Sequence, residues 1–286
     1  MLGIPVRYLL RHPLTVGELL AEPRQTLSTI KDAYLAHREF SRPKCPYQWS
    51  VAWDQSLHAQ IGVRWPCPAT GDFQTLWARV VGELETLGIR PGPESFASWN
   101  DGDAGFVRAL WCLTRHLQPS VVVETGVAHG FSSRFILEAL EQNGSGHLWS
   151  IDLPPVEHAL RQQVGIAVGS HQRSRWSYVR GSSRRRLPDL IRRLPQIDLF
   201  IHDSLHSERN VRFELDSSWA VLGPGGAIVV DDVDANWGFH SFTNAFSGQW
   251  SVVCEAEPLR PDKRRFNQKG LFGIILKEPT RTKIAA

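Results

Sequence analysis

The segment from Val121 to Ser133 constrains the fold of this chain more than any other part of it. An apolar run reaches an acidic residue, Glu124, and then passes through a glycine turn into residues 134–140, whose apolar positions have helical spacing. A strand that feeds a glycine turn and a helix builds a nucleotide-type site at the carboxyl edge of a parallel sheet. Gly126 allows such a turn, and Gly130 allows a ligand to approach the backbone closely.

The residues inside the turn narrow the class of ligand. A dinucleotide-binding turn follows the pattern G-x-G-x-x-G, whereas the residue two positions after Gly126 is Ala128. Nicotinamide-dependent oxidoreduction is therefore a disfavoured alternative for this chain. Ser132 and Ser133 come next, and either hydroxyl is expected to cap the helix that follows.

Two further strands are predicted to end in acidic residues at the same sheet edge. Residues 147–152 form the first of them, and in a Rossmann-like sheet the carboxylate of Asp152 lies beside the glycine turn. There it can accept hydrogen bonds from both hydroxyls of a ribose. Residues 197–203 form the second strand, which ends at Asp203, and His206 follows three residues later.

A βαβ unit is completed by the residues that follow. A helical run leads into the turn Leu-Gly-Pro-Gly-Gly at residues 222–226, and an apolar strand then ends in Asp231 and Asp232. The alternation of strands and helices predicts an α/β chain with a doubly wound, Rossmann-like and mostly parallel sheet of seven strands. Residues 250–254 and 270–276 supply the last two strands as an antiparallel hairpin.

These motifs resemble those of a known superfamily when they are taken in order. E-x-G-x-x-x-G-x-S at the turn is similar to the first motif of class I S-adenosylmethionine-dependent methyltransferases. The order D-x-x-H, helix, L-x-P-G-G, strand and D-D resembles the small-molecule O-methyltransferases of that superfamily, the branch that includes macrolide-sugar and other natural-product enzymes. The resemblance covers about residues 103 to 277.

The resemblance implies an enzyme that methylates a hydroxyl of a small-molecule acceptor. It also implies that S-adenosylmethionine is bound by Glu124, Gly126, Gly130, Ser132, Ser133, Asp152, Ser182 and Asp203. One position departs from the superfamily, because an acid often stands beside the adenine amine after the third strand. Here residues 175–181 are followed by Ser182 and Ser183, and a serine hydroxyl binds an amine more weakly than a carboxylate does.

The acids have a physical reason to act together. Asp203 and Asp231 end strands that should be neighbours, and neighbouring strands lie about 4.8 Å apart. With Asp232 they form a group of three carboxylates, which repel one another unless a proton or a cation intervenes. Hard oxygen ligands of this kind suit Mg²⁺ or a similar divalent cation. The sequence therefore predicts a metal site at Asp203, Asp231 and Asp232.

Methyl transfer needs an acceptor oxygen in line with the methyl group and a path for the proton of that oxygen. A divalent cation lowers the pKa of a bound hydroxyl, and His206 is the nearest candidate base, so Asp203 and His206 are the predicted catalytic residues. The alternative for His206 is a residue at a helix start that only binds the backbone. His129 is expected to pack or to bind the backbone, and His202 is assigned no role.

The composition is that of an ordinary globular protein. The chain has 286 residues, is 42% hydrophobic and 21% charged, and carries a net charge of +3. Basic stretches at residues 183–193 and 260–265 are interpreted as solvated surface, so no nucleic-acid partner is expected. No apolar run has the length of a membrane span and no signal peptide is evident, which predicts a cytoplasmic protein without a membrane partner. The four cysteines are scattered and interpreted as reduced thiols.

The chain is predicted to divide near residue 100. Residues 1–100 form a mainly helical and irregular segment, and residues 101–286 form the methyltransferase-like domain. The first segment matches no motif and is expected to serve as a lid, a substrate wall or a contact within a homo-oligomer. A cofactor-binding or interaction module without catalysis is the alternative from a different class of function.

Five predictions of secondary structure concern residues 15–117. Helices are expected from Thr15 to Phe40, from Asp72 to Leu87 and from Asp103 to Leu117. The stretch from Ser41 to Pro68 is expected to be irregular, and Arg90–Glu94 is expected to break the second helix.

Overall fold

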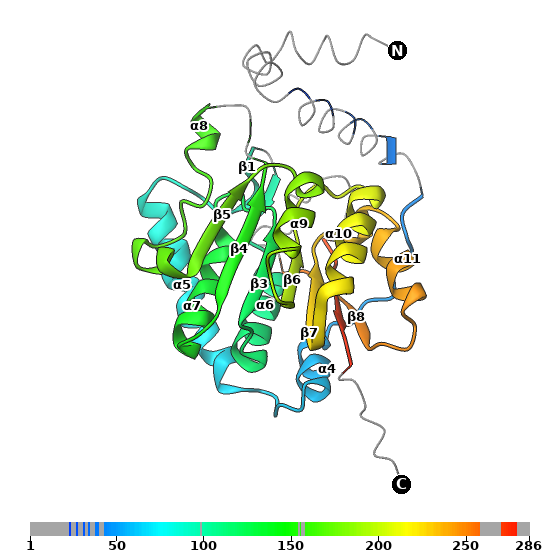
Figure 1. The fold of residues 1–286 in the computed structure, drawn as a ribbon. Coiled ribbons are helices and arrows are strands. Elements are labelled where there is room, and N and C mark those ends of the chain that lie inside the picture. Colours follow the sequence, from blue (N-terminus) through cyan, green and yellow to red (C-terminus); the bar gives the residue numbers. More distant parts are fainter. Residues whose placement is uncertain are drawn as a thin grey trace.

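A computed structural model describes residues 43–97, 99–153, 155, 158–257 and 270–278, together with six isolated helical positions between residues 23 and 39. The described part is built around one sheet of seven strands, with helices on both faces (Figure 1). A separate hairpin pairs β1 (Gly92–Phe96) with β2 (Trp99–Asp101). No helix in the described part of the chain is long and apolar enough to cross a bilayer.

The seven strands stand in the order β5-β4-β3-β6-β7-β9-β8. Neighbouring strands are parallel from β5 through β7, whereas β9 is antiparallel to both of its neighbours. The predicted fold class and the C-terminal hairpin are thereby confirmed. The bounds of the strands are β3 Val121–Thr125, β4 His147–Asp152, β5 Trp176–Arg180, β6 Ile197–His202, β7 Leu222–Val230, β8 Ser251–Cys254 and β9 Phe272–Leu276.

The strand order reverses between β3 and β6, because β3 has its successor β4 on one side and β6 on the other. Open α/β sheets bind ligands at the carboxyl end of such a switch point. The topology alone therefore selects the region beyond the ends of β3 and β6 as the place for a site.

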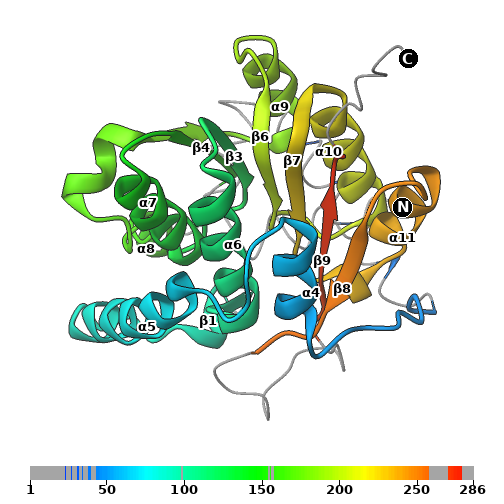
Figure 2. The same ribbon diagram turned by 90° about the horizontal axis from the view of Figure 1, so that it is seen from below.

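Helices form a layer on each face of the sheet (Figure 2). One layer consists of α4 (Trp53–Gln60), α5 (Pro68–Thr86), α6 (Ala104–Leu117) and α7 (Phe131–Asn143). The other consists of α9 (Ser183–Ile191), α10 (Glu208–Val221) and α11 (Gly238–Ala245). The shorter elements are α8 (His158–Arg161) and the 3-10 turns η1 (Ser170–Arg175) and η2 (Val233–Ala235).

Each face of the sheet has its own apolar core, because successive strand residues point to opposite faces. Val122 and Ile201 pack toward α6 and α7, whereas Val123 and Phe200 pack toward α9 and α10. Both faces are covered, so the central strands are continuous apolar runs rather than alternating ones. These continuous apolar runs are the reason why the sequence alone predicts the strands.

Local differences from the sequence predictions lie ahead of the sheet. Helix α5 starts four residues earlier than predicted, with Pro68 in its first turn, and α6 starts at Ala104 with Asp103 as its cap. The break near residue 90 is confirmed, but the hairpin β1–β2 that follows it was not predicted.

Two predictions concern the chain before residue 68. The stretch from Ser41 to Pro68 was wrongly predicted to be irregular throughout, because it contains α4. Of the helix predicted from Thr15 to Phe40, six positions are described and all are helical; the remainder lies outside the described residues.

Candidate active site

The ends of the parallel strands are held together by backbone hydrogen bonds that continue past the strands themselves. Gly126 N donates to Ile151 O at 2.9 Å, and Asp203 N donates to Thr125 O at 2.8 Å. Further along the edge, the backbone N–H of Asp231 donates to the carbonyl oxygen of His202 at 2.9 Å. These bonds place the glycine turn after β3 and the acids after β6 and β7 at one edge of the sheet.

Two positions in the turn after β3 require glycine, because a side chain at either one would collide with a different segment of backbone. Gly126 has φ +88°, and a Cβ atom there would lie 1.7 Å from the carbonyl oxygen of Asp203. Gly130 has φ +79°, and its Cβ would lie 2.9 Å from the Cα of Gly165. At Gly130 the space that a Cβ atom would take is thus filled by the protein's own backbone.

A buried carboxylate holds this turn from beneath. Glu124 is fully buried and accepts hydrogen bonds from the hydroxyls of Ser132 and Ser133, each at 2.6 Å, and from Ser150 on the neighbouring strand at 2.8 Å. Burial raises the pKa of Glu124, and the three hydroxyls act against that shift. The predicted capping role of the two serines is wrong, since Gly130 is the N-cap of α7 and makes no side-chain cap bond.

Two polar residues predicted to bind the cofactor lie at the ends of the next strands along the edge, Asp152 at the end of β4 and Ser182 after β5. Asp152 ends β4 half-buried, and burial together with the charge of Glu124 raises its pKa to about 7. Backbone N–H groups of Val127 and Leu153 act in the opposite direction. Ser182 is the N-cap of α9 and is also half-buried, and its hydroxyl makes no cap bond.

The acids at the ends of β6 and β7 form a group that includes a histidine. One ligand atom from each of Asp203, His206 and Asp231 lies within 4.8 Å of the other two, a spacing that could hold a metal ion. His206 Nε2 lies 3.7 Å from Asp203 Oδ1 and 4.0 Å from Asp232 Oδ2. The compact group thus contains His206 where the sequence predicted Asp232, which stands at its margin in the left-handed conformation, with φ +48°.

Burial, followed by the crowding of like charges, determines the electrostatics of this group. Burial raises the pKa of Asp203, and the charges of Glu124 and Asp232 raise it further. Burial and the two neighbouring aspartates likewise raise the pKa of Asp231 well above its usual value. A bound cation would relieve this repulsion by favouring the ionised carboxylates.

The chemistry of His206 differs from the sequence prediction. Burial, followed by the neighbouring His202, lowers the pKa of His206 to about 3. Its ring is therefore neutral near pH 7, but it is a much weaker base than a histidine with the ordinary value assumed from the sequence. A neutral imidazole with a free lone pair is the form that binds metals.

A family model described as a methyltransferase domain matches residues 123–233. This range runs from β3 to the end of the acid group and includes the glycine turn. Residues 123–233 form a methyltransferase domain. The resemblance seen in the sequence and the enzyme class that it implied are thereby confirmed.

Solved structures similar to the chain share its fold. An O-methyltransferase of Klebsiella pneumoniae, classed provisionally as such, is 17% identical with TM-score 0.52, and the match covers 81% of this chain and 98% of that one. TomG of Streptomyces achromogenes, an O-methyltransferase of tomaymycin synthesis solved with S-adenosylmethionine, is 15% identical with TM-score 0.50, covering 80% and 95%. An O-methyltransferase of Bacillus cereus, solved with S-adenosylhomocysteine, is 13% identical with TM-score 0.50, covering 80% and 98%.

No curated protein matches the chain by sequence. The low identities to the solved structures show the fold of the methyltransferase domain and leave the acceptor to be inferred from the site.

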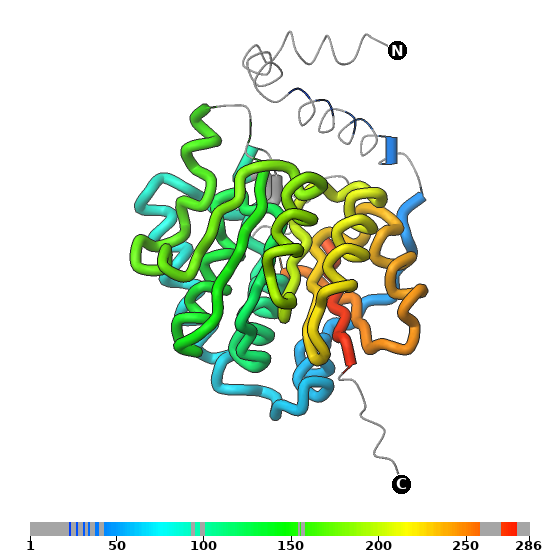
Figure 3. Tube along the Cα trace, viewed as in Figure 1, coloured from blue at the N-terminus to red at the C-terminus, as the bar shows by residue number. Residues whose placement is uncertain are grey.

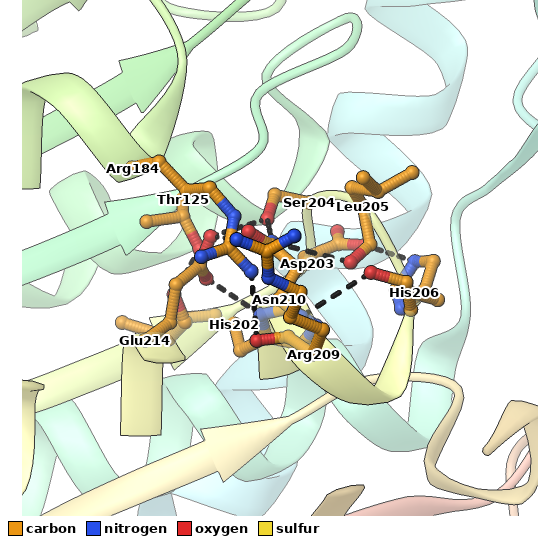
Figure 4. Close-up of polar contacts among 12 residues, drawn as sticks. Thr125, Arg184, His202, Asp203, Ser204, Leu205, His206, Arg209, Asn210 and Glu214 are labelled. Atoms are coloured by element: carbon orange, nitrogen blue, oxygen red, sulfur yellow. Dashed lines mark hydrogen bonds and ion pairs between the residues drawn. The ribbon is translucent and has the colours of Figure 1, made fainter. Parts of the chain in front are cut away.

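A second buried carboxylate in the methyltransferase domain lies next to His202 at the end of β6 (Figure 4). Glu214 of α10 is fully buried and accepts hydrogen bonds at 2.6 to 2.8 Å from His202, Thr125, Ser204 and Asn210. His202 in turn packs edge to face against His206, with ring centroids 5.4 Å apart. Sequence analysis assigned His202 no role, and the network gives it one, which is to connect α10 with the end of β6.

The sequence contained a signal for this network that was not used. Glu214 stands beside Leu215 and one turn from Val211 and Ser218, all of them buried on α10. An acid on the apolar face of a helix needs a buried partner.

The small hairpin also contacts the turn of the methyltransferase domain. His129 Nδ1 lies 2.6 Å from Asp101 Oδ2 of β2, and His129 Nε2 lies 3.0 Å from Gln163 Oε1. Burial would lower the pKa of His129, but the hydrogen bond and charge of Asp101 outweigh it and raise the value. The structure gives His129 a packing role, as predicted, and adds Asp101 as the residue that positions it.

Proposed function

We propose that this chain transfers the methyl group of S-adenosylmethionine to a hydroxyl of a small-molecule acceptor. The observation that carries the proposal is the meeting of three features at the switch point of the sheet: the glycine turn, Asp152 and the group of Asp203, His206 and Asp231. The cofactors present in TomG and in the Bacillus cereus enzyme support the choice of methyl donor.

Asp152 is the residue proposed to bind the ribose of the donor. Its carboxylate ends β4 beside the turn and has its pKa raised to about 7, mainly by burial. Two hydroxyl donors from a ribose would favour the ionised form and compensate for that burial. The buried contacts of Glu124, Ser132 and Ser133 shape the turn that surrounds the donor, and Gly126, Gly130, Ser182 and Asp203 complete the proposed cofactor-binding set.

Asp203, His206 and Asp231 are proposed to hold a divalent cation. Two carboxylates and a neutral imidazole within 4.8 Å of one another provide a suitable donor set, and the mutual repulsion of the acids favours a positive charge between them. When bound, such a cation would lower the pKa of the acceptor hydroxyl. Asp232, 4.0 Å from His206 Nε2, is available as a further acceptor for a water or for the substrate.

The remaining parts of the proposal concern the setting of the reaction. We propose that the segment of residues 1–100 serves as a lid, a substrate wall or a contact between copies of the chain. Acceptor hydroxyls on sugars or phenols fit an active site that combines a cation with carboxylates. The cytoplasm is the proposed location of the reaction.

Binding of the donor tests the first part of the proposal. We expect saturable binding of S-adenosylmethionine by calorimetry, and we expect Asp152→Ala to weaken it by about 10- to 100-fold, because hydrogen bonds to a charged group contribute about 1.5 to 3 kcal/mol. Asp198→Ala is the matched control. Asp198 also accepts two backbone N–H bonds, from Ser120 and Val121, but at the opposite end of β3. Equal effects of the two variants would refute the assignment of Asp152.

Cation dependence tests the second part. Turnover should rise with added Mg²⁺ or Mn²⁺, and Asp231→Ala should lower the rate at saturating donor by about 100-fold, which corresponds to about 2.7 kcal/mol. Donor affinity should remain within a few-fold of the original, because Asp231 is not in the proposed cofactor-binding set. A rate that is independent of added cations and retained in Asp231→Ala would remove the metal from the proposal.

A further inference from the structure

Two histidines and two cysteines gather in the helical layer that contains α4, α5 and α6, away from the acid group. His58 lies on α4, Cys67 is the N-cap of α5, and Cys112 and His116 stand one turn apart on α6. Figure 2 shows these three helices on the same side of the sheet. His58 and Cys67 are nine positions apart, whereas His116 lies 49 positions after Cys67, so the fold brings α6 to the other two helices.

The atoms that could bind a metal face one another at short distances. His58 Nε2 lies 3.1 Å from Cys67 Sγ, and His116 Nε2 lies 3.2 Å from the same sulfur. The ligand atoms of His58, Cys67 and Cys112 all lie within 4.8 Å of one another. These three residues are buried, with exposed fractions of 0%, 6% and 2% in that order.

The tautomer of His58 is determined by its second ring nitrogen. His58 Nδ1 lies 2.7 Å from the backbone carbonyl oxygen of Asp54, which can only accept a hydrogen bond. Nδ1 therefore carries a proton, and the Nε2 of a neutral ring presents a lone pair to Cys67. A backbone carbonyl that holds the remote nitrogen in this way is the usual outer partner of a metal-binding histidine.

Four polar side chains surround the sulfur of Cys67. A Cys67 thiol has one hydrogen, whereas His58, His116, Cys112 and Thr70 all approach its sulfur. Sulfur and nitrogen atoms that can bind a metal thus converge on one buried point.

We propose that His58, Cys67 and Cys112, with His116 as the fourth ligand, bind a structural zinc ion. Thiolate and imidazole ligands select zinc among the common divalent ions, and two of each is an established tetrahedral donor set. Bonds of about 2.3 Å to sulfur and about 2.0 Å to nitrogen place tetrahedral ligand atoms about 3.3 to 3.8 Å apart. The separations of 3.1 Å and 3.2 Å that join Cys67 Sγ to His58 Nε2 and His116 Nε2 reach this range through shifts of a few tenths of an ångström.

The position of the cluster indicates a role in holding the helical layer together. The metal would join α4 and the start of α5 to α6, whose N-cap Asp103 accepts hydrogen bonds from Phe106 and Glu257. Four protein ligands, of which His58, Cys67 and Cys112 are buried, leave no open coordination position for a substrate, which distinguishes a structural site from a catalytic one. This inference does not depend on the proposed methyl transfer, because the two groups share no residue.

The full-length chain, purified without added metal and in the presence of reductant, provides the first test. Elemental analysis should find about one zinc per chain, and Asp231→Ala should retain it because Asp231 belongs to the other group. Cobalt(II) exchanged into the protein should give the absorption band of thiolate-to-cobalt charge transfer. Absence of zinc together with absence of that band would overturn the proposal, and neither readout needs a cysteine variant to fold.

Two alanine variants provide the matched comparison. Cys112→Ala should lose the zinc, and a chelator should then no longer lower the melting temperature. Cys254→Ala removes a thiol that is equally buried but lies on β8, so it should keep both the zinc and the sensitivity to chelator. Zinc retained in Cys112→Ala, or a disulfide between Cys67 and Cys112 in the protein isolated under the same reducing conditions, would refute the site.

Discussion

Replacing Gly126 with alanine is expected to destabilise the fold by about 3 to 5 kcal/mol, or to prevent folding altogether. The new Cβ would lie 1.7 Å from the carbonyl oxygen of Asp203 and 2.5 Å from its carbonyl carbon. Both are backbone atoms at the end of β6, so no change of rotamer relieves the overlap. The positive φ of +88° adds a strain of about 1 to 2 kcal/mol to the cost of overpacking.

A second glycine separates the two causes of this effect. Gly144 ends α7 with φ +74°, but a Cβ there would meet no atom within 4 Å. Gly144→Ala should therefore cost only the backbone strain, about 1 to 2 kcal/mol. Urea unfolding followed by tryptophan fluorescence measures both variants against the original chain. Equal stability of the two variants would mean that the turn and the end of β6 can separate freely, and the proposed donor site would lose its rigid base.

The parts of the fold that the sequence predicted share a strong local signal. Strands β3, β6 and β7 are buried on both faces and so appear as continuous apolar runs, each followed by a glycine turn or an acid. Because parallel strands end at a common edge, the position of each acid follows from the position of its strand. The gathering of Asp203 and Asp231 was predictable for this reason, whereas the inclusion of His206 depended on the loop between β6 and α10.

The parts that were missed depend on contacts between distant segments. Cys67 and Cys112 have no ligand-like spacing, and the pair Cys112 and His116 at helical spacing is common by chance. Their convergence with His58 requires the packing of α4 and α5 against α6, which no local pattern specifies. The contact between Asp101 and His129 likewise depends on the unpredicted hairpin. Both contacts are therefore determined by tertiary packing and not by local secondary-structure propensity.

Removing the carboxylate of Glu214 is the other change with a large expected effect. Glu214→Ala should destabilise the fold by about 3 to 5 kcal/mol, because four donors, three of them buried, lose their common acceptor. Glu214→Gln should cost less, since its amide oxygen still accepts on one side. Asp216→Asn is the control on the same helix, where an exposed ion pair with Arg212 contributes no more than about 1 kcal/mol. Thermal or urea unfolding at pH 7 gives the three values.

The pH dependence of stability distinguishes a lost charge from a lost side chain. Burial alone would raise the pKa of Glu214, but interaction with His202 and the surrounding hydrogen bonds lower it to about 2. A carboxyl group whose folded pKa is depressed stabilises the fold above its unfolded pKa of about 4.5 and loses that contribution as the pH falls toward 2. The original chain should therefore lose stability more steeply between about pH 5 and pH 2 than Glu214→Gln, which has no proton to bind there. Parallel curves for the two proteins would show that Glu214 is not ionised in the folded state, and the network around Glu214 would need a different description.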